Sequence, residues 1–294
     1  MRVADYLLEN KGKPVITFEF SRPKNEKAAV NLDNALAKLK TVDPDYVSVT
    51  FGAGGSTSEG SIQLVEKLKK EYDFSVVAYI AGVGLSPTKM IEVLDKFKEL
   101  SIETMFVIRG DAPTWDENYK PDPDAFFHAS DMISFIKKKY DFCLGAAAYP
   151  EGHIEAESIE RDIEYLKLKV DNGAEYIVAQ YFYDNQYFFD FIERARLAGI
   201  TVPIVPGVMP IYTEGLMNNL AKVCGVTIID EIRDTIAKLP EDDKNAVSEF
   251  GLQFALKQCR ELLTRGVPGL HFYTMNRANT VVSLVETLRK EGLL

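Results

Sequence analysis

Short apolar runs alternate with amphipathic stretches along the whole chain. The runs are rich in β-branched and aromatic residues, as is typical of buried strands, and they occupy residues 14–20, 46–52, 75–82, 104–110, 142–149, 174–180, 202–208 and 270–276. Between them, stretches such as EKAAVNLDNALAKLKTV (26–42) and SIERDIEYLKLKVDNG (158–173) repeat apolar residues at the helical period. About eight strands, each followed by a helix, are the elements of a closed parallel barrel.

We therefore predict an α/β fold, a (β/α)8 TIM barrel, that forms a single catalytic domain over residues 1–294 with no C-terminal regulatory domain. An open doubly wound sheet is the alternative fold. It usually carries a glycine-rich phosphate loop after the first strand, and FEFSRPKNEK has none. Within the pattern, Ser86-Pro87 predicts a helix start and Asn172-Gly173 predicts a helix end.

Composition narrows the class of protein. Hydrophobic residues make up 46% and charged residues 27% of the 294 residues, as in a soluble globule with a sizeable core. No apolar run approaches the roughly 20 residues that cross a bilayer, so we predict no membrane partner. Three cysteines (Cys143, Cys224 and Cys259) lie far apart, which suits the reducing cytoplasm. The formal net charge of −10 argues against a general affinity for nucleic acid.

The residues that end the strands indicate where a site forms. In parallel barrels the active site is built at the carboxyl ends of the strands. Those ends carry polar, charged or glycyl residues, whereas chance would scatter charged residues over strands and loops alike. The strand-end residues are Glu19, Thr50, Phe51, Gly52, Tyr79, Arg109, Gly110, Asp111, Tyr149, Pro150, Glu151, Gln180, Pro206, Gly207, Asn276 and Arg277.

Glu19 is a candidate proton donor. It stands between Phe18 and Phe20, and strand alternation places both aromatic residues on the face opposite to Glu19, which then points into the barrel mouth. Burial disfavours the charged form of a carboxyl group, so a glutamate in such a place can act as a general acid. The alternative is a structural ion pair with Arg22 or Arg277.

Arg109 and Asp111 flank Gly110, which permits a sharp turn over a ligand. Arginine can bind a phosphate or carboxylate through two parallel hydrogen bonds, and Asp111 can accept hydrogen bonds from the edge of a heterocycle. A salt-bridged pair at a strand end is the alternative. His153 and His271 lie near strand ends, but no HxxxH or HxH spacing occurs, so we predict no metal site.

Several of these segments together resemble the 5,10-methylenetetrahydrofolate reductase family, in its bacterial, flavin-dependent form with the catalytic barrel only. The matching segments are FEFSRP, VSVTFGAGG, RGD, AAAYPEGH, LKLKVDNGAEYIVAQYFYD, PIVPGVMPI and FYTMNRA, in the family's order. The resemblance implies reduction of 5,10-methylenetetrahydrofolate to 5-methyltetrahydrofolate by ping-pong exchange through a flavin. It implies FAD as cofactor, with FMN as the alternative. The electrons come from NADH, from NADPH or from a partner subunit, within a homo-oligomer or a hetero-complex.

The resemblance also implies residue roles. Glu19 is the general acid, Asp111 lies near the flavin pyrimidine edge and the pterin, Gln180 binds the pterin, Arg277 binds the folate tail or its neighbourhood, and Thr50 also contacts substrate. The flavin-binding positions are Thr50, Phe51, Ala53, Tyr79, Arg109, Gly110, Asp111, Tyr149, His153, Ala156, Asp162, Tyr165 and Lys169.

The chain departs from the family pattern at a few of these positions. Tyr79 stands where the family often has histidine, while Tyr165 and Leu168 replace polar or arginine residues that meet the cofactor's phosphates and adenosine. The segment YTEGL lacks a phenylalanine that folds NADH over the flavin, unless Tyr212 replaces it, which leaves the electron donor open. Two other activities stay open: a barrel pterin-dependent methyltransferase or aldolase, and a flavin-binding subunit of a larger electron-transfer complex.

Overall fold

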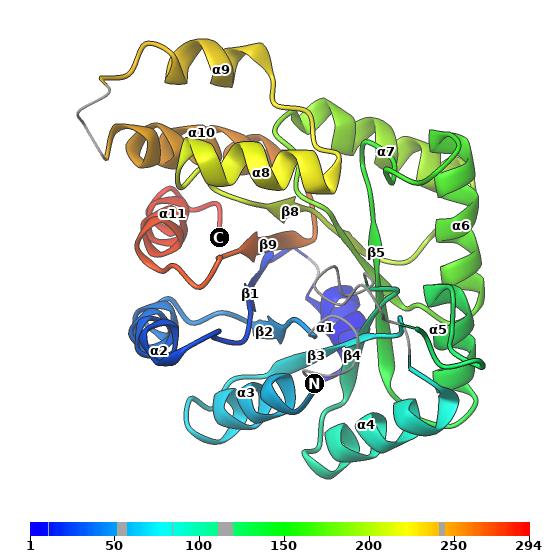
Figure 1. Cartoon of the computed structure of the whole chain (residues 1–294). Helices are drawn as coiled ribbons and strands as arrows, with labels where there is room; N and C mark the ends of the chain where they lie inside the picture. Colours follow the sequence, from blue (N-terminus) through cyan, green and yellow to red (C-terminus); the bar gives the residue numbers. More distant parts are fainter. Residues whose placement is uncertain (11, 52–57, 84, 111–119, 241–244) are drawn as a thin grey trace.

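Parallel strands curl into a barrel with helices around it (Figure 1). The computed structural model describes residues 1–10, 12–51, 58–83, 85–110, 120–240 and 245–294. In these residues nine strands form one sheet, in the order β7-β6-β5-β4-β3-β2-β1-β9-β8. The strands are β1 (Val15–Phe20), β2 (Tyr46–Val49), β3 (Val76–Ala81), β4 (Thr104–Ile108), β5 (Cys143–Ala148), β6 (Tyr176–Ala179), β7 (Ile204–Val205), β8 (Gly207–Val208) and β9 (Gly269–Tyr273).

The barrel closes at a strand that proline divides in two. β7 pairs with β6, and β8 pairs with β9, so the two short strands together take one place in the barrel. Pro206 lies between them and has no N–H to donate to the ladder. Its carbonyl oxygen accepts a hydrogen bond from the backbone N–H of His271 at 3.0 Å. The predicted TIM-barrel fold is confirmed, and the run at 202–208 differs only in being interrupted.

Helices follow the strands as the pattern predicts. They are α1 (Val3–Glu9), α2 (Glu26–Lys40), α3 (Ser58–Lys70), α4 (Pro87–Glu99), α5 (Ala129–Lys137), α6 (Ile159–Asp171), α7 (Asn185–Leu197), α8 (Glu214–Cys224), α9 (Asp230–Ile236), α10 (Ala246–Thr264) and α11 (Asn279–Lys290). The Ser86 hydroxyl accepts a hydrogen bond from the Lys89 N–H at the start of α4. The helix α6 ends at Asp171, with Asn172 as its C-cap before Gly173, as predicted. None of the described helices combines the length and the apolar character needed to cross a membrane.

The helix α1 covers the amino-terminal end of the barrel. The backbone N–H of Val3 donates to Thr104 Oγ1 at 3.2 Å, and that of Ala4 donates to Cys143 Sγ at 3.4 Å. Thr104 and Cys143 are the first residues of β4 and β5. The opposite end, where the strands finish, is therefore the end at which a ligand can enter.

Strand alternation separates an outer apolar layer from an inner polar one. Phe18 and Phe20 are fully buried, whereas the side chain of Glu19 keeps 17% of its surface exposed. In the register of the sheet, Glu19 pairs with Tyr273, and Thr17 pairs with His271. Because residues two apart on a strand share a face, Glu19, Tyr273 and His271 lie on the same inner surface.

We expect Gly251→Ala to lower the melting temperature. Gly251 lies in α10, and a Cβ atom there would overlap the backbone carbonyl of Ile211. Relieving such overpacking typically costs about 1–3 kcal/mol of unfolding free energy, and each kcal/mol shifts the melting temperature of a chain of this size by about 2–4 °C. The matched control is Gly215→Ala in α8, where no atom lies within 4 Å of the added Cβ. Differential scanning calorimetry that gives equal melting temperatures for both variants would contradict this packing.

Candidate active site

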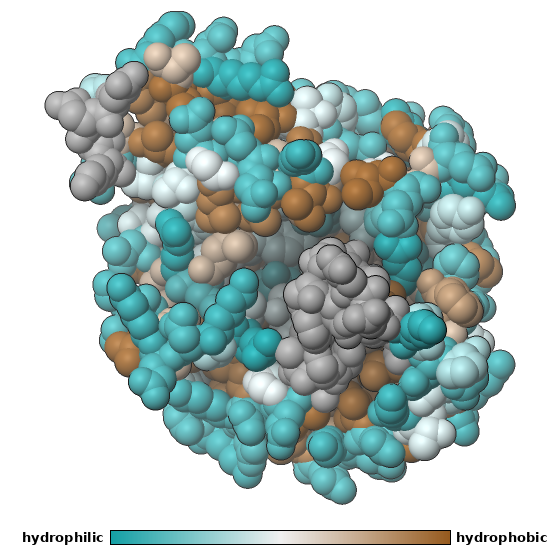
Figure 2. Space-filling model, viewed as in Figure 1, coloured by the Kyte–Doolittle hydropathy of each residue, from teal (hydrophilic) through white to brown (hydrophobic). Residues whose placement is uncertain are grey.

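A cavity of about 270 Å³ lies at the carboxyl ends of the strands. Figure 2 shows this face of the molecule hollowed near its centre. Seven strands or the residues that directly follow them contribute to the lining, so segments far apart in the sequence meet here. The lining residues are Glu19, Thr50, Tyr79, Phe106, Ile108, Arg109, Gly110, Ala147, Tyr149, His153, Gln180 and Tyr273.

The carboxyl group of Glu19 lies between a phenol and an imidazole. The Tyr79 hydroxyl donates a hydrogen bond to Glu19 Oε2 at 2.7 Å, and His271 Nε2 lies 3.7 Å from the same oxygen. His271 is 1% exposed, and neither ring nitrogen has a hydrogen-bond partner among the described residues. The hydroxyl of Thr274 donates to the backbone carbonyl of Glu19 at 2.6 Å, which fixes the strand at this point.

Tyr79 remains a hydrogen-bond donor at neutral pH. Burial raises the pKa of its phenol well above the ordinary value, and the nearby Glu19 raises it further. A protonated phenol at 2.7 Å stabilises the carboxylate form of Glu19 once its proton has left. The arrangement therefore suits a carboxyl group that gives a proton to a ligand in the cavity. The ion pair of Glu19 with Arg22 or Arg277, the alternative from the sequence, does not form within the described residues.

Gln180 and Thr50 extend the polar lining. The backbone N–H of Gln180 donates to the Ala148 carbonyl at 2.8 Å, and its side-chain Oε1 accepts from the Tyr181 N–H at 3.1 Å. With Oε1 held in this way, the amide NH₂ is the group that Gln180 presents to a ligand. Thr50 follows β2, and its carbonyl accepts a hydrogen bond from the Ser61 hydroxyl at 3.0 Å.

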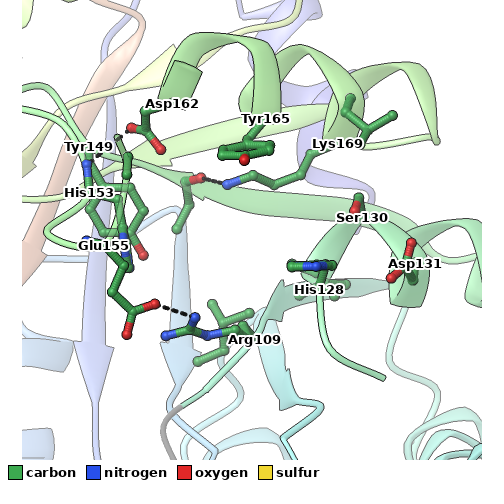
Figure 3. A pocket seen from close by; sticks show the side chains of 16 residues that line it. Arg109, His128, Ser130, Asp131, Tyr149, His153, Glu155, Asp162, Tyr165 and Lys169 are labelled. Carbon is green, nitrogen blue, oxygen red and sulfur yellow. Dashed lines mark hydrogen bonds and ion pairs between the residues drawn. The ribbon is translucent and has the colours of Figure 1, made fainter. Parts of the chain in front are cut away.

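A groove of about 460 Å³ between α5 and α6 continues from the barrel mouth (Figure 3). It shares Ile108, Arg109, Ala147, Tyr149 and His153 with the central cavity. The predicted residues Ala156, Asp162, Tyr165 and Lys169 line it as well. The two spaces therefore form one elongated site, which runs from the barrel mouth into the groove between the two helices.

A partly buried lysine and a buried aspartate line the groove. Lys169 donates to the Ala147 carbonyl at 2.7 Å, and burial lowers its pKa to about 8. Burial also raises the pKa of Asp162, which accepts a hydrogen bond from the backbone N–H of His153 at 3.3 Å. Tyr149 packs edge-on against the His153 ring at 4.6 Å between centroids. The groove thus carries a positive charge that is only partly solvated, as an anionic group requires.

Arg109 lines both spaces, and Gly110 lines the central cavity. The Arg109 guanidinium forms an ion pair with Glu155, which lowers the pKa of that carboxyl group (Figure 3). Gly110 has φ +79°, and a Cβ atom there would lie 2.8 Å from the Cβ of Ala81, so the position requires glycine. Asp111 and Ala53, both predicted as site residues, lie outside the described residues.

Two predicted residues lie beside the elongated site and not in its lining. Phe51 directly follows Thr50 and is buried, with 7% of its surface exposed. Arg277 is exposed and lines a separate hollow, where its guanidinium carbon lies 5.2 Å from the centre of the Tyr212 ring. The structure therefore brings Glu19, Thr50, Tyr79, Arg109 and Gln180 together, but it places Arg277 outside their cavity.

Sequence reasoning missed four groups at the site. His128, Ser130 and Asp131 line the groove where α5 begins, and no side chain caps this helix. The polar residues in FFHASD, directly before an apolar helical pattern, were the available signal. His271 was considered only as a metal ligand, although the alternation in LHFY places it on the same face as Tyr273. Across the described part of the chain, no group of three or more His, Cys, Asp or Glu residues is arranged to hold a metal ion.

Comparisons with known proteins show which family the chain resembles. A family model described as methylenetetrahydrofolate reductase matches residues 4–289. Methylenetetrahydrofolate reductase 1 of Schizosaccharomyces pombe is 35% identical over 299 residues, which cover 100% of this chain and 49% of the relative. Methylenetetrahydrofolate reductase (NADH) 1 of Arabidopsis thaliana is 31% identical over 301 residues, which cover 98% of this chain and 51% of the relative. The chain thus spans about half the length of the curated relatives it matches.

Solved structures confirm the fold. A protein from Clostridium thermocellum, described as binding two copies of 5-methyl-5,6,7,8-tetrahydrofolic acid, superposes with a TM-score of 0.67 at 14% identity. The match covers 99% of this chain and 100% of that protein. Because the family model extends over nearly the whole chain, from α1 to the end of α11, the chain belongs to the methylenetetrahydrofolate reductase family.

Proposed function

We propose that residues 1–294 form a catalytic barrel that reduces 5,10-methylenetetrahydrofolate to 5-methyltetrahydrofolate with a bound flavin. The observation that carries the proposal is the Glu19 carboxyl group in the barrel mouth, which accepts a hydrogen bond from Tyr79 at 2.7 Å. Its cavity continues into a groove that contains the partly buried Lys169. The first space suits a flat heterocycle beside a proton donor. The second suits the phosphate-bearing remainder of a cofactor. Family membership supports both assignments.

The residues present fit FAD better than FMN. FMN ends at a single phosphate, whereas the groove continues past Lys169 to the start of α5 and to Tyr165 and Leu168. Both of these side chains are more than 40% exposed, at 43% and 46%, so they offer an apolar surface on which an adenine can pack. Lys169 and the uncapped N–H groups at the start of α5 would hold the phosphates. When bound, the flavin supplies the hydride that the methylene carbon of the folate accepts.

Glu19 opens the methylene bridge of the substrate. As the bond between the methylene carbon and N10 breaks, N10 takes the proton of Glu19, and the electron pair of N5 forms the iminium. The carboxylate that remains is stabilised by the Tyr79 hydroxyl, with the His271 ring 3.7 Å away on the inner side. The Gln180 amide NH₂ orients the pterin. The family pattern also gives Asp111 a part in this step, because a negative charge favours the cationic iminium.

Anaerobic turnover of the purified, FAD-loaded protein tests the proposal. We expect 5-methyltetrahydrofolate to form from 5,10-methylenetetrahydrofolate with NADH, NADPH or a low-potential donor, and the preferred donor identifies the source of electrons. Chromatography of the folate products is the measurement. A colourless protein that takes up no flavin would contradict the proposal and favour a pterin methyltransferase or aldolase. Flavin that is reduced but passes no electrons to folate would favour an electron-transfer subunit.

A further inference from the structure

His271 is a buried titratable residue to which the catalytic steps above give no task. It lies on β9, which runs beside β1 (Figure 1), and only 1% of its surface is exposed. Neither Nδ1 nor Nε2 has a hydrogen-bond partner among the described residues. Every imidazole carries at least one N–H, and a buried polar atom without a partner lowers stability. Retaining such a ring next to Glu19 therefore indicates a role in the handling of its proton.

The neighbours of His271 hold its ring in one orientation. The backbone N–H of His271 donates to the Pro206 carbonyl at 3.0 Å, in the gap between β7 and β8. The ring packs edge-on against Tyr273, with 5.0 Å between the ring centroids. The Tyr273 hydroxyl donates to the Ala179 carbonyl at 3.4 Å, so its proton is directed away from Glu19. Only small movements of the imidazole are therefore needed or allowed.

The Nε2 atom of His271 faces one particular oxygen of Glu19. It lies 3.7 Å from Oε2, the oxygen that already accepts a hydrogen bond from the Tyr79 hydroxyl. Hydrogen bonds of catalytic groups are often long in the absence of substrate and shorten when it binds. With both donors on Oε2, the acidic proton of the carboxyl group belongs on Oε1. No described residue forms a hydrogen bond or ion pair with Oε1, so this oxygen is left for the substrate.

The Nδ1 atom of His271 has a hydroxyl group within its own row of the barrel interior. Thr17 on β1 pairs with His271 in the register of the sheet, and Tyr46 on β2 pairs with Thr17 on the other side. Thr17 is fully buried, and its Oγ1 lacks a hydrogen-bond partner in the described part of the chain. A hydroxyl can rotate to donate to a ring nitrogen. Such a bond to Nδ1 would leave the proton of the neutral ring on Nε2.

We infer, on the basis of the proposed function, that His271 is a positioning residue for the acid Glu19. The neutral imidazole accepts a hydrogen bond at Nδ1 from the Thr17 hydroxyl and donates one from Nε2 to Glu19 Oε2. This contact keeps the acidic proton on Oε1, from which N10 of the substrate takes it. Once the proton has left, His271 and Tyr79 together stabilise the carboxylate. His271 thus acts through Glu19 and exchanges no proton with the folate.

Anaerobic stopped-flow kinetics of the FAD-loaded protein test this role. His271→Gln keeps an amide N–H that can replace Nε2–H, whereas His271→Leu keeps no donor. We expect His271→Leu to slow folate reduction about 10-fold, as the loss of one hydrogen bond to a charged group allows, and to spare reduction of the flavin. His271→Gln should keep most of the rate. In a Glu19→Gln background, His271→Leu should have no further effect, because the two residues act as one unit.

The matched control for packing is Phe272→Leu. Phe272 is the next residue on β9, is fully buried and contacts Phe18 on the outer face of the sheet. Its variant also removes ring atoms from the barrel wall, so the melting temperature of both variants can fall. Only His271→Leu should slow folate reduction. Equal slowing by Phe272→Leu would show that the effect is structural and would overturn the inference.

The pH profile of folate reduction gives a second readout. The groups that face His271 and Glu19 are the phenols of Tyr46, Tyr79 and Tyr273, and burial raises the pKa of each, so all three stay protonated near neutral pH. Loss of the Glu19 proton therefore sets the pH above which the rate falls. Removing a donor to the carboxylate disfavours its charged form. In His271→Leu this fall should move to higher pH, and an unmoved profile would contradict the contact.

The tautomer of His271 can be measured without any substrate. The chain has three histidines, so long-range ¹H–¹⁵N spectra of histidine-labelled protein contain few signals, and His271→Gln identifies the one from His271. We expect a neutral ring with its proton on Nε2, and Thr17→Val should disturb this signal. A proton on Nδ1, an imidazolium at neutral pH, or native folate reduction by His271→Leu would overturn the inference while the proposed function stands. Absence of 5-methyltetrahydrofolate with the unmodified protein would instead reject the proposed function.

Discussion

Replacing Glu19 with Gln is expected to lower the rate of folate reduction by about 10²–10⁴-fold while FAD stays bound. The amide keeps the size of the carboxyl group and can still accept a hydrogen bond from Tyr79, but it has no proton to give to N10. Reduction of the flavin by its donor does not require that proton, so this half-reaction should keep most of its rate. Anaerobic stopped-flow measurement of the two half-reactions separates the effects.

The control for this variant is Glu193→Gln. Glu193 is an exposed glutamate of α7 that lines none of the spaces described above, and its variant should keep both half-reactions. Folate reduction by Glu19→Gln at more than a tenth of the native rate would show that another group delivers the proton. His271 is then the first residue to test, because its Nε2 lies 3.7 Å from the Glu19 carboxyl and has no hydrogen-bond partner in the described structure.

Replacing Lys169 with Gln is expected to weaken FAD binding by about 10- to 100-fold at pH 7. A hydrogen bond to a charged group contributes about 1.5–3 kcal/mol, and the buried ammonium is the group that we assign to a cofactor phosphate. The matched control is Lys167→Gln, two residues away on α6, where the ammonium pairs with Asp171 and lies outside the groove. Fluorescence titration of the cofactor-free protein with FAD gives the Kd values.

The affinity of Lys169→Gln and of Lys167→Gln for FAD should depend differently on pH. Burial lowers the pKa of Lys169 to about 8, so in the free protein the ammonium is present below that pH and lost above it. FAD affinity of the unmodified protein and of Lys167→Gln should therefore begin to fall as the pH rises through about 8. Lys169→Gln has no charge to lose and should show a flat profile from pH 7 to 9. A native profile that is flat as well would contradict a contact between Lys169 and the phosphates.

The local sequence pattern was sufficient to predict the helices and strands and most of the residues at the barrel mouth. The period of apolar residues located every strand of the barrel to within a few residues, and Ser86 and Asn172-Gly173 marked helix boundaries as predicted. Most of the strands are shorter than the apolar runs that predicted them. Since all parallel strands finish at one end, listing the residues at those ends was enough to bring Glu19, Thr50 and Gln180 into one cavity.

Which side chains meet at the site was decided by contacts between segments far apart in the sequence. His271 reaches Glu19 because β9 pairs with β1 when the barrel closes, and no feature near either residue in the sequence indicates that pairing. Arg109 pairs with Glu155 from the segment after β5, and Arg277 lines a hollow with α2 and lies outside the cavity of Glu19. The sequence by itself thus determined the elements, their order and the family, because these depend on neighbouring residues. Only the tertiary structure decided which side chains meet, because that depends on barrel register and on the packing of segments far apart in the chain.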